Sequence, residues 1–226
     1  MRAGPSHPTL RALGVLAAAA LGLGASSLVA AQDETLPLAL TPAQQEGPYY
    51  PVEIPSDHDA DLTLVGDSGT VAAGRPLDLE GVLLDSTGGP IEGAVVEIWQ
   101  TDALGVYLHP GDPGFPERDE SFQGYGTSET DGDGAWAFRT ILPEIYGGRP
   151  RHIHAKVQVE GQDVLTTQIY FSGGDIPQAG TLEASGSELD ALLIEVIAET
   201  DEDGAEILRA EHRLVVEPQG ATTRGT

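Results

Sequence analysis

The segment from His152 to Val159 reads HIHAKVQV and alternates between polar and apolar side chains. Successive side chains of a β-strand point to opposite faces, so this period of two predicts a strand. Both histidines then share one face, and the opposite face is apolar, formed by Ile153, Ala155, Val157 and Val159. Two imidazoles one strand period apart, on a strand whose back can be buried, favour a metal site built on a sheet. The pattern HxH alone is also common among ordinary surface and core histidines.

Most of the remaining chain carries the same kind of signal. Short runs that alternate or are uniformly apolar are separated by turns rich in Gly, Pro and Asp. Strands are expected at 77–84, 94–100, 135–140, 152–159, 164–171, 192–199 and 207–217. Residues 32–75 look loop-like, and only residues 187–198 could compete as an amphipathic helix. We therefore expect an all-β protein, a β-sandwich with long loops around the metal site, in one domain covering residues 32–226.

The first 31 residues have the features of a secretory signal peptide. Arg2 and Arg11 supply positive charge, residues 13–28 are small and apolar, and the small residues 29–31 offer a cleavage site. The apolar run is also close to the ~18 residues that a membrane span needs, so a retained anchor is the alternative. We expect cleavage, which predicts a secreted or periplasmic protein without stable membrane association. The chain has no Cys, so no disulfide supports the exported fold.

The charge of the chain limits its partners. It carries 36 acidic and 11 basic residues, a net charge of −25. Such an excess of negative charge argues against nucleic acid and anionic membranes as binding partners. The net charge gives no information about the fold. The sequence leaves open whether the chain forms a homo-oligomer.

Two tyrosines extend the histidine pair into a larger set of donors. Tyr107 follows the strand expected at 94–100, and Tyr146 lies six residues before His152. Either alone would be an ordinary half-buried aromatic. Because a phenol has a pKa of about 10, it coordinates as a phenolate only to a strong Lewis acid. Phenolate oxygen combined with imidazole suits Fe(III) better than Zn(II) or Cu(I).

Five segments, in order along the chain, resemble the intradiol ring-cleavage dioxygenases, the group of catechol, hydroxyquinol and protocatechuate dioxygenases. The segments are TPAQQEGPYYP (41–51), VEIWQTDALGVY (96–107), TDGDGAWAFRTILPEIY (130–146), RPRHIH (149–154) and TQIYF (167–171). The resemblance implies a prealbumin-like β-sandwich. It also implies an Fe(III) enzyme that uses O₂ to cleave a catechol-type ring between its two hydroxylated carbons, giving a muconate-type diacid.

The same resemblance assigns roles to individual residues. The implied iron ligands are Tyr107, Tyr146, His152 and His154. Tyr146 would be the tyrosinate that leaves when the diol binds. Arg149 would stabilise negative charge on the substrate ring, with Gln168 beside it. We expect Gln168 to line the pocket, because on its strand it lies opposite the apolar Ile169 and Phe171.

The sequence does not identify the diol or give a role to His109. The negative charge of the chain disfavours carboxylated diols such as protocatechuate at low ionic strength.

A second reading belongs to a different class of protein. Residues 81–99 also resemble transthyretin-like and adhesion-type β-sandwich modules, which bind or space without chemistry. Such a module has no need for two phenols and two imidazoles together. Colour would separate the two readings, because Fe(III) bound to tyrosinate absorbs visible light and a binding module does not.

Overall fold

The computed structural model describes residues 36–173, 186–201 and 204–218, so the expected leader at 1–31 lies outside the described residues. The strands are β1 Pro76–Asp85, β2 Val95–Trp99, β3 Tyr125–Glu129, β4 Ala135–Ile141, β5 His152–Val159, β6 Gln162–Ser172, β7 Leu193–Thr200 and β8 Glu206–Val216. The short helices are η1 Phe115–Glu117 and α1 Ser187–Leu192. All seven expected strands are confirmed, and β3 is an additional one. No helix of the described residues is long and apolar enough to cross a membrane.

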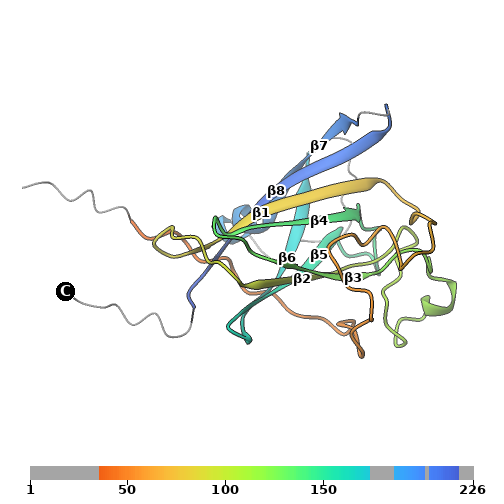
Figure 1. Cartoon of the computed structure of the whole chain (residues 1–226), viewed down its shortest axis with the longest axis horizontal. Coiled ribbons are helices and arrows are strands. Elements are labelled where there is room, and N and C mark those ends of the chain that lie inside the picture. The colour runs from red at the N-terminus through yellow and green to blue at the C-terminus, as the bar shows by residue number, and fades with distance from the viewer. Residues whose placement is uncertain (1–35, 174–185, 202–203, 219–226) are drawn as a thin grey trace, which may run out of the picture. The chain divides into compact units, whose positions relative to one another are not determined.

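The strands form one hydrogen-bonded sheet in the order β3-β2-β5-β6-β7-β8-β1-β4. Its two halves, β3-β2-β5-β6 and β7-β8-β1-β4, are joined by a short parallel pairing of β6 with β7. The edge strands β3 and β4 approach each other, and the amide of Ala137 donates to Ser128 Oγ at 3.3 Å. The all-β expectation is confirmed, while the expected sandwich takes the form of a single, nearly closed sheet (Figure 1).

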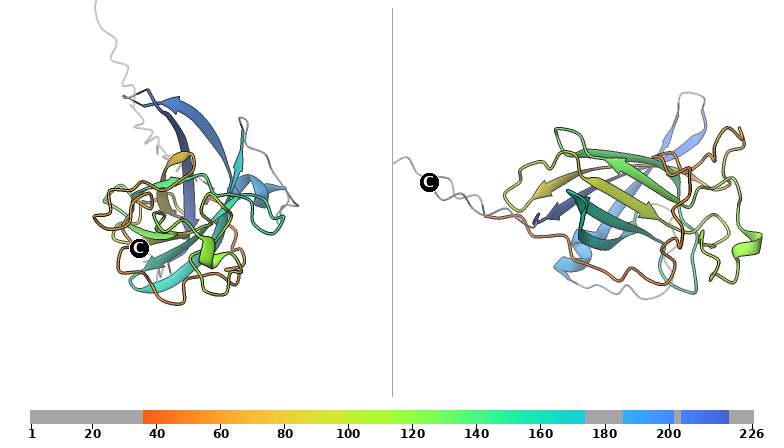
Figure 2. Two further views of the ribbon diagram at one scale, coloured as in Figure 1. Left: turned by 90° about the vertical axis from the view of Figure 1, so that its right-hand side faces the viewer. Right: turned by 60° about the horizontal axis from the view of Figure 1, so that its bottom comes forward.

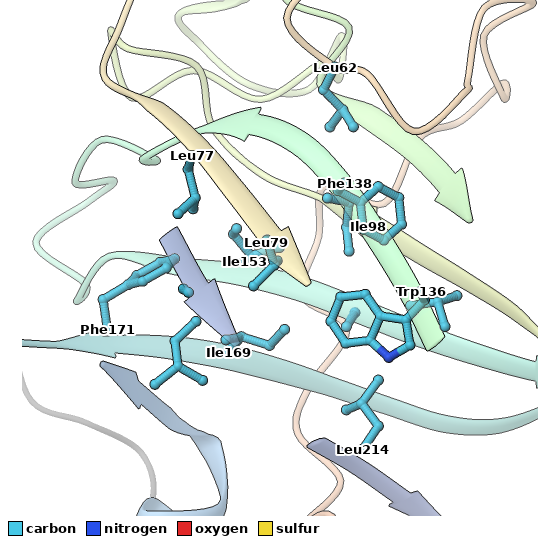
Figure 3. Packing of buried hydrophobic residues seen from close by; sticks show 14 of the residues in the cluster. Leu62, Leu77, Leu79, Ile98, Trp136, Phe138, Ile153, Ile169, Phe171 and Leu214 are labelled. Atoms are coloured by element: carbon cyan, nitrogen blue, oxygen red, sulfur yellow. The ribbon is translucent and has the colours of Figure 1, made fainter. Parts of the chain in front are cut away.

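Both halves of the sheet contribute to one hydrophobic core (Figure 3). The predicted apolar face of β5 belongs to it, since Ile153, Ala155 and Val157 are fully buried and Val159 packs against the cluster. Burial of this face fixes the register of β5, because a slip of one residue would exchange its two faces. The histidines are therefore held on the side of the strand away from the core.

Residues 36–75 form no named helix or strand, and the part of this segment around Gln44 and Glu46 crosses the face of β5 and β6 that is opposite the core. Its backbone bonds to β6 through the amide of Gln44, which donates to the carbonyl of Thr166 at 2.9 Å. Glu46 forms an ion pair with Lys156 of β5 at 2.8 Å. In Figure 2 (right) the orange part of this segment runs along the lower side of the molecule. The side of the sheet that bears the histidines is therefore covered by a loop.

A third buried histidine, His212, points into the core from β8. His212 is the direct partner of Gly81 on the neighbouring strand β1. A Cβ on residue 81 would come within 2.3 Å of the Trp136 side chain, so only glycine fits at that position. No hydrogen-bond partner for His212 Nε2 is found among the described residues. Burial, and to a lesser degree the nearby charge of Arg213, lowers the pKa of His212 to about 4.

We predict that His212 makes the protein sensitive to acid. The unfolded chain takes up a proton near pH 6.5, whereas the folded state resists protonation of His212 until about pH 4. The contribution of the neutral imidazole to the free energy of unfolding is therefore complete above the range between these two pKa values, and it is lost as the pH falls through that range. Denaturant unfolding at pH 7 and pH 4 should show the wild type losing about 3 kcal/mol more than His212→Gln. His58→Gln, at an exposed histidine, is the control and should follow the wild type; equal losses in wild type and His212→Gln would contradict the prediction.

Candidate metal centre

The candidate site lies where β2, β5 and β6 pair side by side. His154 is opposite Trp99 of β2 on one side and Gln168 of β6 on the other. His152 is opposite Tyr170 of β6. Residues paired across neighbouring strands project to the same face of a sheet. The register therefore gathers these side chains on the face opposite the core.

Three of the four predicted ligands bring their donor atoms together. The hydroxyl oxygen of Tyr107 lies 3.1 Å from Nε2 of His152 and 3.2 Å from Nε2 of His154. All three residues are at most 4% exposed. No group of three or more His, Asp or Glu side chains placed to hold a metal exists in the described part of the chain. A metal site therefore needs the phenols as well as the histidine pair.

A hydrogen bond to the backbone determines which ring nitrogen of His152 carries the proton. Its Nδ1 lies 2.7 Å from the carbonyl oxygen of Pro150. Because a carbonyl only accepts hydrogen bonds, Nδ1 carries the proton and Nε2 keeps its lone pair toward Tyr107. This is the arrangement in which a metal-binding histidine is held by a bond from its other ring nitrogen.

Two buried carboxylates shape the loop that carries Tyr107. Asp112 Oδ2 accepts the Tyr107 amide at 3.0 Å, and Asp102 Oδ1 accepts the Val106 amide at 3.0 Å. Gly105, with φ of +80°, leaves no room for a Cβ, which would lie 2.7 Å from the carbonyl oxygen of Ile145. This glycine lets the Tyr107 loop pack directly against the segment that carries Tyr146.

The fourth predicted ligand, Tyr146, lies in the same aromatic cluster with its hydroxyl directed to another tyrosine. Its ring is 5.5 Å from that of Tyr107, nearly perpendicular to it. The Tyr146 hydroxyl donates to the Tyr49 hydroxyl at 2.9 Å. This hydrogen bond, followed by burial, raises the pKa of Tyr146 to about 12.

Arg149 and Gln168 are also in contact, as predicted. Nη2 of Arg149 donates to Oε1 of Gln168 at 3.0 Å, and the Tyr170 hydroxyl donates to the same oxygen at 3.0 Å. The side-chain nitrogen Nε2 of Gln168 donates to the backbone carbonyl of Gln45 at 2.8 Å. Gln168 is fully buried, so it fixes the guanidinium from within the sheet.

The electrostatics of the site favour the neutral forms of the four candidate ligands. Burial lowers the pKa of His152 to about 4, and burial also lowers that of His154 well below its usual value. Burial raises the pKa of Tyr107 above the ordinary range, with the positive charge of Arg149 opposing the rise. The imidazoles thus have free lone pairs at neutral pH. The phenols would give up their protons only to a strongly Lewis acidic cation.

Several residues of the site were not predicted. All six tyrosines of the chain gather around it: Tyr49, Tyr50, Tyr107, Tyr125 and Tyr146 with Trp99, and Tyr170 against His152. The segment TPAQQEGPYYP (41–51), which in the sequence supports only the family resemblance, supplies Tyr49 and Tyr50 to the site. The concentration of a scarce residue type in that motif was the available signal.

His109, whose role the sequence leaves open, lies at the edge of the aromatic cluster. Its ring centroid is 5.4 Å from that of Tyr49. Nδ1 accepts the amide of Gly111 at 2.9 Å, so the proton of the neutral ring sits on Nε2. The side chain is partly exposed, and its ring contact places it beside Tyr49 rather than among the three converging donor atoms.

Comparison with known proteins agrees with this site. A family model described as Dioxygenase matches residues 45–216. The protocatechuate 3,4-dioxygenase beta chain of Burkholderia cepacia is 31% identical over 200 residues, covering 83% of each chain. Curated catechol 1,2-dioxygenases from Acinetobacter match over a smaller share, and the chain spans about half of their length.

Solved structures give the same relationship. The dioxygenase domain of a dioxygenase carbohydrate-binding protein fusion from Streptomyces sp. SirexAA-E superposes with a TM-score of 0.58 at 30% identity, covering 79% of this chain and 99% of that one. An intradiol ring-cleavage dioxygenase from Tetranychus urticae gives a TM-score of 0.60 at 25% identity, covering 80% and 96%. The chain therefore shares its overall fold with these proteins.

Proposed function

The chain belongs to the family of intradiol ring-cleaving dioxygenases, and on that premise we propose that it is a non-haem Fe(III) enzyme. It uses both atoms of O₂ to cleave a catechol-type ring between its two hydroxylated carbons and releases a muconate-type diacid. The observation that supports this most strongly is the meeting of Tyr107 Oη with the two Nε2 atoms at 3.1 and 3.2 Å.

The residues present fit a ferric ion. Donor atoms that each lie about 2.0–2.2 Å from a common metal are separated from one another by about 3 Å when the angle between them is near 90°. The separations of Tyr107 Oη from the two Nε2 atoms, 3.1 and 3.2 Å, agree with that value. Neutral imidazoles and ionisable phenols together form the hard nitrogen and oxygen set that Fe(III) prefers. The ion would be held by Tyr107, Tyr146, His152 and His154.

Bound Fe(III) would supply the Lewis acidity that draws electron density out of a chelated diol. The pair formed by Tyr146 and Tyr49 can handle the proton that a diol must lose. With a pKa raised to about 12, Tyr146 in its ionised form is a strong base. It can therefore take a proton from a diol, whose conjugate base is the weaker of the two, and the Tyr49 hydroxyl is in place to accept a hydrogen bond from the protonated Tyr146 at 2.9 Å.

Arg149 provides fixed positive charge beside the donor atoms. Its positive charge opposes the rise in the pKa of Tyr107 and of Tyr146 and lowers the pKa of both histidines. Gln168 holds the guanidinium from within the sheet, so the positive charge needs no rearrangement as negative charge develops on the substrate ring. Such prearranged charge is a large contributor to catalysis in sites that exclude water.

We further propose that residues 1–31 are a cleaved leader and that the protein acts outside the cytoplasm on free phenolic compounds. The charge pattern and the small residues before Gln32 support this proposal. The net charge of −25 favours neutral diols such as catechol or hydroxyquinol over carboxylated ones. The alternative, a non-catalytic binding module, is not favoured, because the family match extends over the segments that carry the four donors.

The experiment that tests the proposed function is oxygen uptake by the iron-loaded wild type with catechol, 4-methylcatechol, hydroxyquinol and protocatechuate. The protein should be red-brown, and O₂ and diol should disappear in equal amounts while muconate absorbance rises. The same preparation stripped of iron by a chelator is the control. A colourless iron-loaded protein, or the absence of uptake with every diol, would reject the proposal.

Arg149→Ala should separate iron binding from catalysis. The four donor side chains are untouched, so the variant should keep its iron and its colour. Turnover should fall by about 10²- to 10³-fold, the usual effect of removing one group that stabilises developing charge. Arg209→Ala, which removes ion pairs with Glu199 and Asp78 and touches none of the site residues, is the control and should leave turnover unchanged. Normal turnover by Arg149→Ala would remove this residue from the proposed mechanism.

A further inference from the structure

The two histidines of the site are oriented by different means. His152 is fixed by the bond from its Nδ1 to the carbonyl of Pro150. In contrast, Nδ1 of His154 is buried and has no hydrogen-bond partner among the described residues. The imidazole of His154 instead lies flat on the indole of Trp99, with ring centroids 4.8 Å apart and planes 8° from parallel.

This stack follows from the register of the sheet. Trp99 and His154 are direct partners across β2 and β5, so their side chains leave the sheet side by side on the same face. Both are almost fully buried, at 1% and 3% exposure. Gly47 lies beside the imidazole, since a Cβ there would be in van der Waals contact with His154 Cε1 at 3.4 Å. The ring therefore has an aromatic plane on one face and the loop backbone near its edge.

Trp99 is in turn held in place by Tyr50 and Lys156. The ring of Tyr50 meets the indole edge-on, at 5.0 Å and 90°. Nζ of Lys156 lies 3.8 Å from the centre of the Tyr50 ring and 5.8 Å from that of Trp99. Lys156 is the direct partner of Glu97 across β2 and β5, one strand period from the Trp99–His154 pair.

The buried charges in this cluster are compensated, which makes the arrangement rigid. Lys156, the only lysine of the chain, forms an ion pair with Glu46 at 2.8 Å. The carboxylate of Glu97 accepts the Tyr50 hydroxyl at 2.7 Å and the amide of Gln158 at 3.0 Å. Moving Glu46 or Tyr50 would take a partner away from a buried charged group, Lys156 or Glu97, which is strongly unfavourable.

We propose that Trp99, backed by Tyr50 and Lys156, is a positioning residue that holds the plane of His154 so that its Nε2 faces Tyr107 and the metal. The inference rests on the proposed iron site and adds to it the group that orients the second imidazole. Partners that orient metal-binding side chains contribute about 10- to 100-fold in metal affinity. The stack on Trp99 orients the imidazole of His154, as the hydrogen bond to Pro150 orients that of His152.

The test compares the two tryptophans of the chain, both of which are buried. Full-length wild type, Trp99→Leu, Trp99→Phe, Trp136→Leu and Trp136→Phe are loaded with Fe(III). Release of iron to an excess of a competing ferric chelator is then timed by the loss of visible absorbance and by iron content. The EPR spectrum of the ferric ion before chelation reports the ligand arrangement, and thermal unfolding reports the fold.

Trp99→Leu should release iron about 10- to 100-fold faster than the wild type and show an altered EPR spectrum. Trp99→Phe, which keeps a flat ring and protects against a failure of the leucine variant to fold, should fall between the two. The Trp136 variants should lose thermal stability but release iron at the wild-type rate with an unchanged spectrum. Lys156→Met should accelerate release less than Trp99→Leu does.

Three results would overturn the inference. If both Trp99 variants hold iron as the wild type does, Trp99 only fills space. If the Trp136 variants accelerate release equally, the effect is a general loosening of the fold. A wild type that takes up no Fe(III) would refute the proposed function itself and this inference with it, so the two failures are distinguished by the wild-type loading step.

Discussion

The alternation of side chains along β5 is the constraint on which the rest of the structure depends. One face of this strand, at Ile153, Ala155 and Val157, is fully buried in the core and cannot be turned outward without large loss of stability. The other face must then present His152, His154 and Lys156 beneath the loop that covers the sheet. Burial of the apolar side chains on one face of β5 thus fixes the position of the polar side chains on its other face.

A site built in this way buries charge and must compensate it. The carboxylates of Asp102 and Asp112 accept backbone amides, and Arg149 is tied to Gln168. The phenols are stabilised as neutral groups, since burial raises the pKa of Tyr107 and the bond to Tyr49 raises that of Tyr146. The site is therefore prearranged for a cation that takes phenol oxygens and imidazole nitrogens together, which links the packing of the fold to the proposed chemistry.

Features with a local period or a linked set of motifs could be predicted from the sequence. The bounds of β5 matched, as did the contact between Arg149 and Gln168 and the meeting of Tyr107 with both histidines. Strand β3, with the sequence YGTSE, was missed because its glycine and polar residues give no strand pattern and only pairing with β2 stabilises it. The stack of Trp99 on His154 depends on which strands pair and in which register. That information is non-local, so no segment of the chain reveals it.

The central claim is that two phenols and two imidazoles bind one ferric ion. Anomalous X-ray scattering at the iron absorption edge, from crystals of the iron-loaded protein, tests it most directly. The account predicts a single peak within bonding distance, about 2 Å, of the hydroxyl oxygens of Tyr107 and Tyr146 and of Nε2 of His152 and His154. A peak elsewhere in the molecule, or one that lacks both tyrosine oxygens, would contradict it.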